Sequence, residues 1–499
     1  MQVQTIFYED KDKDKDKDKD KDKVDFDKIL TKRMERYNYL LLKSKFQFKQ
    51  YQYDGVKWCL NNEIKPKSFR GGFIADEMGL GKTIMMIGLM FVNYLQHTLI
   101  VVPPVLIHQW FKEIYKTTGH KALLFYGDNK KKYTQEHINK AHIVLTTYNM
   151  ILPENCLLKN ISWNRVIYDE AHHLRNRNTI RYKACLKIKA QICWLVTGTP
   201  IQNKKRDFNN LCCIAGIKPV IYTNPKEIKN FVLRRTKQQV GINLPPVNKQ
   251  ECLIEWQNPL EMKLSEEIHS LLPNQTFVSI NKQRKLANAF GKAGVLVALL
   301  RARQSCILPN LMRKNMEKLC SSGFIRTKSL EALKYTSKLD AVIKLMLERK
   351  DNGKGKIVFC HYQNEIDVIA QRLLKGGMTK VVCYDGRNSG GHNLATLSEP
   401  ADALIIQIQT GCEGLNLQLN FSEIYFVSPH WNPCVEDQAI ARCHRIGQTK
   451  EVDVFKFEMR GFINDPTSQS ITLEKYVNQV QNIKRDISKQ ILDLEPPVI

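Results

Sequence analysis

The sequence predicts an α/β protein with two parallel-sheet domains and a helical segment between them. Short apolar runs alternate with helical stretches over residues 46–215. The pattern then becomes mainly helical, and a second alternating region begins near residue 338. Apolar runs of strand length between amphipathic segments are typical of a parallel sheet with helices on both faces. The length of 499 residues accommodates about three domains.

The apolar runs mark the expected strands in chain order. In the first region they are GGFIAD, HTLIVVPP, KALLFYG, HIVLTTY, RVIYDE and CWLVTGTP. One further strand is expected at residues 251–256, within the helical segment. In the second region they are KIVFCHY, KVVCYDG, DALIIQIQ and EIYFVSP. The clearest helix is expected at residues 433–446, with Asn432 as its N-cap, Pro433 as its first residue and Gly447 as its stop.

These elements divide the chain into five expected parts. They are an N-terminal extension (1–45), a first sheet domain (46–215), a basic and mainly helical insertion with linker (216–337), a second sheet domain (338–460) and a helical tail (461–499). The extension contains a strict Lys/Asp repeat at residues 11–23. We expect this repeat to be disordered, because neither a helix nor a strand of this pattern has an apolar face to bury. The alternative is an arm that binds nucleic acid or a partner.

The chain is strongly basic, with 76 Lys and Arg against 50 Asp and Glu and a net charge of +26. Removing the Lys/Asp repeat leaves +25, and residues 281–338 alone carry 13 basic and 2 acidic residues. Such an excess favours a polyanionic partner, nucleic acid first, although a merely soluble basic protein remains the alternative. Helices in the insertion could line a phosphate backbone without reading bases, or could simply form a solvated face.

Composition also argues against some classes of protein. The N-terminus lacks the basic start and apolar core of a secretory signal. The longest apolar stretch, residues 84–95, is too short for a membrane span of about 20 residues. The 14 Cys are therefore expected to be reduced thiols, and no CxxC pair offers the ligands of a zinc ribbon. We expect an intracellular protein that is neither secreted nor bound to a membrane.

The segment DEMGLGKT follows the first expected strand and precedes an apolar helix. Its glycines let backbone amides turn toward a phosphate at the helix N-terminus. Lys82 would neutralise the β and γ phosphates, and the Thr83 hydroxyl would bind Mg²⁺. Asp76 stands where the strict phosphate-loop pattern has its first glycine, and the alternative is a glycine-rich turn with a solvent-facing lysine. The candidate nucleotide-binding residues are Asp76, Glu77, Met78, Gly79, Leu80, Gly81, Lys82 and Thr83.

The segment DEAH closes the expected strand RVIYDE, about 90 residues after the phosphate loop. Adjacent acids at a strand's carboxyl end can divide two tasks. Asp169 would hold the metal through water, and Glu170 would orient and deprotonate the attacking water. Alone, such a pair is usually solvated. Its position after a phosphate loop in the same domain makes the catalytic interpretation strong.

A third segment, QAIARCHRIGQ, lies in the second sheet domain. On one continuous helix, Gln438, Arg442 and Arg445 share a face. Two guanidinium groups suit the charge that develops on a transferred γ-phosphate, whereas an isolated basic helix would be an ordinary surface feature. A phosphate loop in one domain and candidate arginine fingers in the other indicate a catalytic site that forms when the domains close. Hydrolysis would then couple to domain motion, as in a motor.

The motifs resemble those of the Swi/Snf-type ATPases, a branch of the superfamily 2 helicases and translocases. FKQYQYDGVKW is similar to the family's glutamine motif, which makes Gln52 the expected adenine contact. DEMGLGKT, DEAHHLRN, LVTGTPIQN, FVLRRTKQQVGINLPP, KIVFCHYQNEID, QTGCEGLNL and PHWNPCVEDQAIARCHRIGQ follow in the family's order. Gln438 corresponds to a nucleotide contact of the last motif. VVPPVLIHQW and IVLTTYNM resemble segments that touch the DNA backbone, which points to Thr146 and Thr147, and Trp431 and Asn432 match a segment for DNA engagement.

The resemblance implies two RecA-like lobes with a helical insertion, ATP and Mg²⁺ as cofactors, and DNA-stimulated ATP hydrolysis that drives translocation on duplex DNA. LLRARQSCILPNLM is most similar to the branch with post-replication repair translocases, but the ring finger frequent there is missing, so ubiquitin-ligase chemistry is not implied. Three residues depart from the family pattern: Glu413 and Gln407 in the fifth motif, and His173 after the DEAH box.

Two other functions stay open at this point. One is a helicase that separates DNA or RNA strands with a wedge not visible in the sequence. The other is an ATP-gated DNA-binding scaffold, which the complete set of acids and arginines disfavours. The Lys- and Asn-rich composition and the simple repeat also resemble compact ATPases of large DNA viruses, for transcription or genome handling. We therefore expect location in a nucleus or at a viral replication site.

Overall fold

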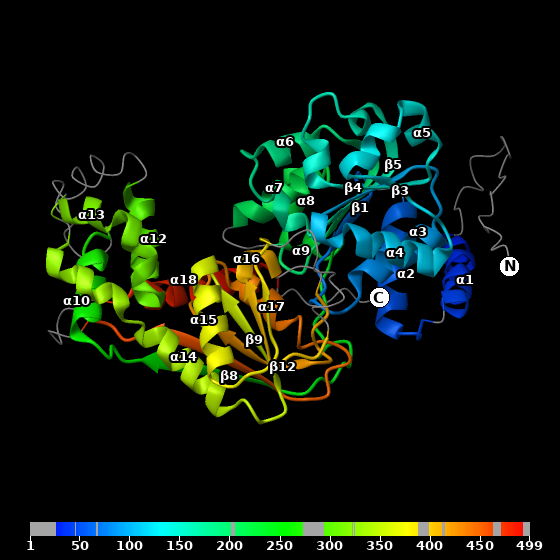
Figure 1. The fold of residues 1–499 in the computed structure, drawn as a ribbon. Coiled ribbons are helices and arrows are strands. Elements are labelled where there is room, and N and C mark those ends of the chain that lie inside the picture. Colours follow the sequence, from blue (N-terminus) through cyan, green and yellow to red (C-terminus); the bar gives the residue numbers. More distant parts are fainter. Residues whose placement is uncertain are drawn as a thin grey trace, which may run out of the picture. The chain divides into compact units, whose positions relative to one another are not determined.

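The computed structural model describes residues 26–44, 46–65, 68–200, 205–272, 294–321, 323, 325–387, 399–411, 415–462 and 471–492 (Figure 1). The chain forms two compact units. The first comprises Met1–Asn243 and Asp486–Ile499, and the second comprises Leu244–Arg485. Each unit contains one sheet, and we call them lobe 1 and lobe 2. The Lys/Asp repeat at residues 11–23 lies outside the described residues.

Lobe 1 contains a seven-stranded, entirely parallel sheet in the order β3-β4-β2-β5-β6-β1-β7. All the expected strands of this region are confirmed, and the central residues of all of them except β3 are buried. The strands are β1 (Gly71–Ile74), β2 (Thr98–Val102), β3 (Leu123–Phe125), β4 (Ile143–Thr147), β5 (Ser162–Asp169), β6 (Lys189–Val196) and β7 (Val232–Leu233). Sequence periodicity could not predict β7, because the strand has only two residues. Since β7 pairs with β1, part of the expected insertion belongs to lobe 1.

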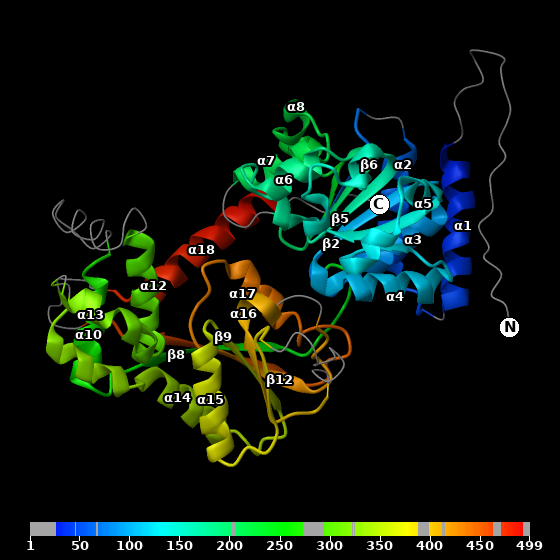
Figure 2. The ribbon, with the colours of Figure 1, turned by 45° about the horizontal axis from the view of Figure 1, so that its top comes forward.

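Helices cover both faces of this sheet, as Figure 1 shows. One face carries α1 (Phe26–Ser44), α2 (Gln50–Ile64), α3 (Lys82–Val92) and α4 (Ile107–Thr118). The other carries α6 (Ile180–Leu186), α7 (Lys205–Ile214), α8 (Pro219–Tyr222) and α9 (Pro225–Ile228), while α5 (Gln135–Lys140) follows β3. Figure 2 shows α1 along the outer side of this layer. The expected N-terminal extension therefore ends in a helix that belongs to lobe 1, with Met34 and Tyr37 each 1% exposed.

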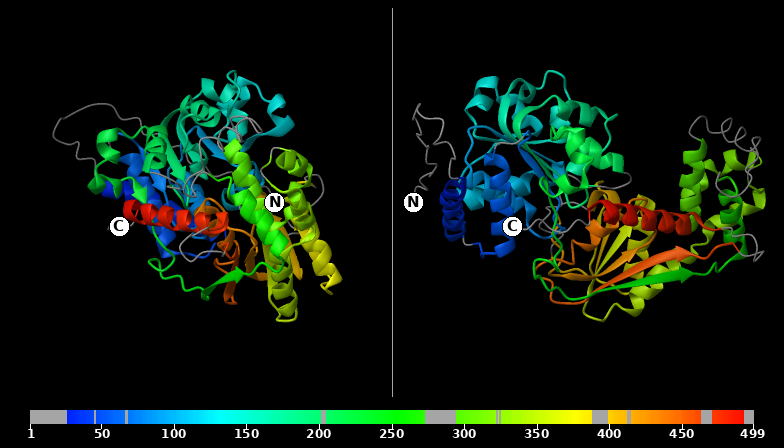
Figure 3. Two further views of the ribbon diagram at one scale, coloured as in Figure 1. Left: turned by 90° about the vertical axis from the view of Figure 1, so that its left-hand side faces the viewer. Right: turned by 180° about the vertical axis from the view of Figure 1, so that it is seen from behind.

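Lobe 2 contains a six-stranded parallel sheet in the order β10-β11-β9-β12-β13-β8. The strands are β8 (Val247–Ile254), β9 (Gly355–Cys360), β10 (Val381–Tyr384), β11 (Ala403–Gln407), β12 (Phe421–Phe426) and β13 (Val452–Met459). The helices beside this sheet include α14 (Ser337–Glu348), α15 (Gln363–Lys375), α16 (Ile408–Gly411), α17 (Pro433–Ile440) and α18 (Leu473–Leu492). Of α18, the residues up to Arg485 belong to lobe 2. The strand expected inside the insertion is β8, which pairs along its whole length with β13 (Figure 3).

The helical insertion forms a core of its own within lobe 2. It comprises α10 (Pro259–His269), α12 (Gly294–Ile307) and α13 (Arg313–Ser321), and the start of α18 packs into the same cluster through Leu473 and Val477. The expected segment 216–337 is therefore divided between lobe 1, the sheet of lobe 2 and this helical cluster. Composition could not predict that division, because strand pairing depends on neighbours far away in the sequence. Among the described helices, none combines the length and apolar character needed to cross a bilayer.

Candidate active site

The phosphate loop lies between β1 and α3 at the carboxyl edge of the lobe 1 sheet. Gly79 and Gly81 adopt left-handed backbone conformations, with φ of 92° and 80°. Such angles are accessible to glycine at little cost and strained for other residues. Gly81 is the N-cap of α3 and makes no side-chain cap, so the first backbone N–H groups of the helix face the loop without a capping oxygen from that residue. This is the geometry in which a helix N-terminus binds an anion.

Two predicted nucleotide contacts, Lys82 and Gln52, lie against this loop. The Lys82 ammonium donates to the backbone oxygens of Asp76 at 2.9 Å and Glu77 at 3.3 Å. Gln52 of α2 donates from Nε2 to the Leu80 oxygen at 3.1 Å. A Cβ atom at Gly81 would lie 2.4 Å from the same Nε2, so α2 approaches the loop as closely as a glycine permits. The glutamine motif and the phosphate loop therefore meet within one lobe.

The carboxylates of Asp76 and Glu77 are occupied by the segment after β7. Asp76, which is fully buried, forms an ion pair with Arg235 at 2.6 Å. Glu77 accepts from the backbone N–H of Lys237 at 2.8 Å and pairs with its ammonium at 3.0 Å. That Asp76 and Glu77 contribute to nucleotide binding stays a prediction. They anchor the loop, whereas Thr83 lies partly exposed in the first turn of α3.

Asp169 ends β5 and has a fixed orientation. Its Oδ2 accepts from the Trp110 indole at 2.7 Å, and its Oδ1 accepts from the backbone N–H of Glu170 at 2.9 Å. Burial, together with the negative charge of Glu170, raises the pKa of Asp169 well above its usual value, while Lys82 opposes the shift. The phosphate loop follows β1 and the DEAH segment follows β5, so both lie at the edge that the carboxyl ends of the parallel strands share.

Glu170 follows in a strained backbone conformation, with φ of 47° and ψ of 48°. It is the one non-glycine residue with positive φ in the described parts of the chain. The Tyr148 hydroxyl donates to the backbone oxygen of Asp169, the residue before this bend, at 2.7 Å. His172 Nδ1 lies 3.2 Å from the Glu170 carboxylate and 3.3 Å from the Thr197 hydroxyl. Strained residues of this kind cluster at functional sites.

The TGT segment after β6 adjoins the loop. A Cβ atom at Gly198 would lie 3.0 Å from the Met78 side chain and 3.5 Å from the Lys82 ammonium. Gly198 thus lies beside the phosphate loop, and Thr197 contacts His172 of the DEAH segment. The phosphate loop, the DEAH segment and the TGT segment therefore lie together. Residues 201–203 of the same motif lie outside the described residues.

The predicted DNA contacts Thr146 and Thr147 do not reach the surface. Both are fully buried at the end of β4, and the Thr146 hydroxyl donates to the Phe125 oxygen at 2.8 Å. Both positions belong to a strand buried on its two faces. Their side chains are enclosed in the sheet, and a contact of these two residues with DNA stays a prediction.

In lobe 2 the helix predicted at residues 433–446 begins as expected. Asn432 Oδ1 accepts from the Cys434 backbone N–H at 3.2 Å, and Pro433 is the first helical residue. The helix, however, ends at Ile440, so Gln438, Arg442 and Arg445 do not share one helical face. Tertiary contacts hold the chain beyond that point: Leu417 donates to the Arg442 oxygen at 3.1 Å, and the His444 ring contacts the Pro245 oxygen at 2.9 Å.

The two predicted arginine fingers nevertheless lie near each other in lobe 2. Burial, and then the neighbouring charge of Arg442, lowers the pKa of Arg445. The Arg445 side chain donates to Asn416. Gln438 is 3% exposed. That these residues reach a nucleotide held by lobe 1 stays a prediction.

Comparisons with known proteins agree with these motifs. Residues 51–227 match the model of the SNF2-related domain, and residues 337–447 match that of the helicase conserved C-terminal domain. The chain contains an SNF2-related domain and a helicase conserved C-terminal domain. The two matched ranges contain the phosphate loop and DEAH segment of lobe 1 and the Asn432 to Arg445 segment of lobe 2.

Relatives of this SNF2-related chain are larger proteins. An ATP-dependent helicase of Mycoplasma genitalium, MG018, is 28% identical over 89% of this chain and 42% of its own length. Human chromodomain-helicase-DNA-binding protein 6 is 27% identical over 89% of this chain and 18% of its own length. A solved structure of the Sulfolobus solfataricus SWI2/SNF2 ATPase core with double-stranded DNA is 24% identical, covers 90% of this chain and 93% of that chain, and has a TM-score of 0.38. The chain thus spans less than half the length of both curated relatives.

Trp431 and Asn432 lie in the range that matches the helicase conserved C-terminal domain, and both make contacts inside lobe 2. The Arg303 guanidinium lies 5.5 Å from the centre of the Trp431 ring, and the Tyr476 ring packs edge-on at 6.4 Å. The Trp431 oxygen accepts from Lys484 of α18 at 2.7 Å. The Asn432 side chain caps α17, and Trp431 connects α12 with α18. That these two residues contact DNA stays a prediction.

The basic insertion is less exposed than its composition suggests. Lys338 is fully buried and pairs with Glu474 of α18, and Arg303 lies under Trp431 and donates to the Pro429 oxygen. Exposed basic side chains of the described part are Arg313, Lys314, Arg326, Lys328 and Lys334. The basic residues of 281–293 and Glu413 lie outside the described residues, while Gln407 donates to the His361 oxygen at 3.3 Å.

Sequence patterns missed the residues that orient the site. Trp110, Tyr148 and Arg235 each contact a predicted residue through the fold. Trp110 and Arg235 belong to motifs recognised by resemblance, but no local pattern connects either to its partner. The partners lie 59 and 159 residues away along the chain.

Proposed function

We propose that this chain is an ATP-dependent duplex-DNA translocase, in which hydrolysis between two RecA-like lobes drives movement along DNA. The observation that carries the proposal is the convergence of the phosphate loop, Asp169, Glu170 and the TGT segment at one edge of the lobe 1 sheet. The family match and the printed names of the relatives, an ATP-dependent helicase and a chromodomain-helicase-DNA-binding protein, support the same activity.

The residues present fit a Mg²⁺-nucleotide. The backbone N–H groups at Gly79–Lys82 would hold the phosphates at the N-terminus of α3, and the Lys82 ammonium would balance their charge. Gln52 would contact the adenine. The Thr83 hydroxyl and the Asp169 carboxylate supply hard oxygen ligands of the kind that Mg²⁺ prefers. Such an ion, when bound, would neutralise phosphate charge.

Glu170 is the proposed general base, and its carboxylate would accept a proton from the attacking water. Its backbone has the left-handed conformation, and His172 contacts one of its carboxylate oxygens. Arg442 and Arg445 of lobe 2 are proposed to stabilise the charge on the transferred phosphate, and Gln438 to contact the nucleotide. Catalysis would then require both lobes.

The first test compares ATP hydrolysis with duplex DNA, single-stranded DNA and RNA. We expect the strongest stimulation by duplex DNA. The absence of stimulation by any of them would contradict a nucleic-acid motor. Glu170→Gln should bind ATP and lose turnover by about 10²-fold or more, whereas Lys82→Ala should weaken both. Normal turnover by Glu170→Gln would remove Glu170 from the role of base.

The second test separates translocation from unwinding. A translocase displaces a third strand from a triplex but leaves a forked duplex intact. Unwinding of the fork would favour the strand-separating helicase instead. The exposed basic residues of the insertion should make DNA affinity fall steeply with salt, because phosphate contacts release counterions.

We further propose Mg²⁺ as the metal, in line with the oxygen ligands above, and a nucleus or a viral replication site as the location. A viral source rests on the composition and the Lys/Asp repeat alone. An expression time course in infected cells tests it, since a host protein would be present before infection.

A further inference from the structure

Arg235 lies where the chain runs beside the phosphate loop. Val232 and Leu233 pair with Phe73 and Ile74 of β1. The ladder continues past the strands, because the Ala75 N–H donates to the Leu233 oxygen at 2.7 Å and the Glu77 N–H donates to the Arg235 oxygen at 2.9 Å. The first residues of the loop are therefore held as an extension of the sheet.

The Arg235 side chain, which is 5% exposed, contacts three elements at once. On the loop, its Nε and Nη2 donate to the two carboxylate oxygens of Asp76 at 3.2 and 2.6 Å. On α2, its Nη1 donates to the Tyr51 oxygen at 2.5 Å. On α3, its Nη2 lies 3.5 Å from the Met85 sulfur. These three elements carry every lobe 1 residue proposed to contact the nucleotide except those of the DEAH segment.

The packing around this guanidinium leaves no spare room. A Cβ atom at Gly55 of α2 would lie 2.8 Å from Arg235 Nη2 and 2.7 Å from the Met85 sulfur. Gly55 lies one helical turn after Tyr51 and next to Gln52 along the same helix. The guanidinium therefore fills the space between α2, α3 and Asp76.

We propose that Arg235 is a positioning residue for nucleotide binding, and that Asp76 is its anchor rather than a ligand of phosphate or metal. This inference rests on the proposed function. Removing the guanidinium would leave the Asp76 carboxylate buried without its counter-charge, which is strongly unfavourable. Lysine offers a single point charge in place of a planar fork and could not reach Asp76, Tyr51 and Met85 together. The loop would then lose its place relative to Gln52, Lys82 and Thr83.

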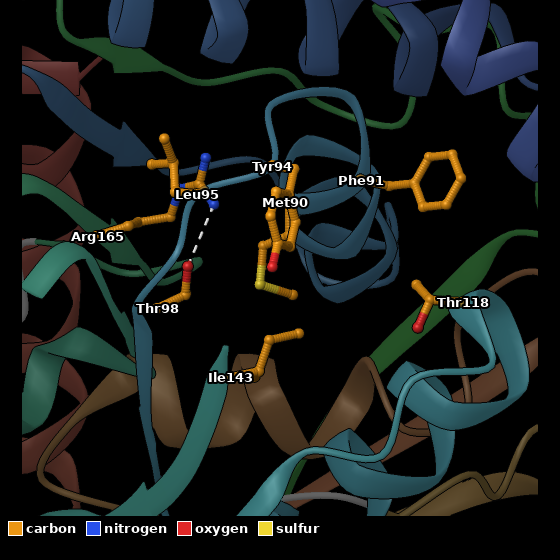
Figure 4. A pocket seen from close by; sticks show the side chains of 8 residues that line it. All are labelled: Met90, Phe91, Tyr94, Leu95, Thr98, Thr118, Ile143 and Arg165. Carbon is orange, nitrogen blue, oxygen red and sulfur yellow. Dashed lines mark hydrogen bonds between the residues drawn. The ribbon is translucent and has the colours of Figure 1, made fainter. Parts of the chain in front are cut away.

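Lobe 1 contains a matched control at the other end of α2. Glu63 and Arg165 are fully buried, with Arg165 Nε and Nη2 donating to the two carboxylate oxygens at 2.6 and 2.5 Å. Figure 4 shows Arg165 beside a small cavity lined by α3 and the β2 region, where it reaches the Thr98 hydroxyl at 3.4 Å. This pair also holds α2 in place. In the part of the chain that the structure describes, the hydrogen bonds of Glu63 and Arg165 do not involve the phosphate loop.

The experiment compares Arg235→Met, Arg235→Lys and Arg165→Met by thermal unfolding, by binding of a fluorescent ATP analogue, and by KM for ATP and kcat. For Arg235→Met we expect Kd and KM to rise about tenfold or more, with a smaller loss for Arg235→Lys. Arg165→Met should lower the melting temperature and leave the Kd of the folded protein within about twofold.

An Arg235→Met protein that folds and binds the analogue like the wild type would overturn the inference. If that variant does not fold, Asp76→Asn provides the same test, because it keeps the shape of the anchor and removes its charge. Weak binding of the analogue by folded Asp76→Asn supports the positioning role of the Arg235–Asp76 pair. Binding with wild-type affinity overturns it. Failure of the wild type itself to bind the analogue would instead contradict the proposed ATPase function.

Discussion

The indole N–H of Trp110 donates a hydrogen bond to Oδ2 of Asp169 at 2.7 Å. Trp110 lies on α4 and is 1% exposed, and Asp169 ends β5, two elements that are distant in sequence. The other carboxylate oxygen, Oδ1, accepts from the Glu170 N–H. Together the two hydrogen bonds fix the plane of the carboxylate. Groups that orient a metal-binding carboxylate affect metal affinity even though they do not touch the metal.

Trp110→Phe should therefore raise the Mg²⁺ concentration needed for half-maximal ATP hydrolysis, by about tenfold. The ring keeps its packing, and the carboxylate loses its donor. Trp163→Phe is the matched control, because Trp163 is also buried and donates to the Leu158 oxygen at 3.0 Å, away from the site. An equal Mg²⁺ requirement in both variants would show that Trp110 does not orient Asp169. The measurement is a Mg²⁺ titration of the ATPase at saturating ATP.

Tyr148→Phe should lower kcat about five- to tenfold and change KM for ATP little. In the wild type this hydroxyl donates a hydrogen bond to the backbone oxygen of Asp169, just before the Glu170 bend. One such hydrogen bond contributes about 1 kcal/mol. Steady-state kinetics give the two constants. Tyr182→Phe, which removes a hydrogen bond to the Asn210 oxygen at 3.2 Å, should affect stability and leave kcat unchanged. A similar fall in kcat for both variants would indicate general destabilisation instead.

Gly81→Ala should abolish binding of a fluorescent ATP analogue. The new Cβ would meet Gln52 Nε2 at 2.4 Å, and the φ of 80° adds strain of about 1–2 kcal/mol. Gly216→Ala separates the two effects, because its φ is 72° and an added Cβ would have no atom within 4 Å. That control should lose stability through strain alone and still bind the analogue. Normal binding by Gly81→Ala would contradict the close approach of α2.

His269 should make lobe 2 sensitive to acid. Burial lowers the pKa of His269 to about 4, while its ring joins the Ser265 oxygen of α10 to the Leu473 N–H of α18. Glu474, itself paired with Lys338, and the Cys306 thiol also face the ring. The neutral form is favoured in the folded state. The corresponding stability is therefore fully present above about pH 6.5 and is lost as pH falls toward 4, by up to about 3 kcal/mol.

Thermal unfolding between pH 7.5 and pH 5 measures this dependence. The melting temperature of the wild type should fall more steeply than that of His269→Gln, which has no group to titrate at this position. His108→Gln, at an exposed position of α4, should follow the wild type. Parallel curves for the wild type and His269→Gln would mean that His269 does not titrate on unfolding.

Local patterns predicted much of the fold and part of the site. Burial of each strand leaves an apolar run in the sequence, and a left-handed turn requires glycine, so the strands and the loop glycines Gly79 and Gly81 were predictable. The helix after Asn432 began as its N-cap indicates but ended at Ile440, because contacts of Leu417 and Pro245 hold the chain beyond it. Local patterns did not predict the buried partners of Asp76 and Thr146, which are Arg235 and the backbone oxygen of Phe125.

The sequence by itself determined which residues end the buried strands and where the backbone can turn, since both follow from the chemistry of neighbouring residues. Only the tertiary structure decided what those residues contact. Arg235 meets Asp76 because β7 pairs with β1, and Trp110 meets Asp169 because α4 packs on the lobe 1 sheet, where β4 is its neighbour. Pairing of distant segments follows from the order of strands in the sheet, and no local pattern of residues encodes that order.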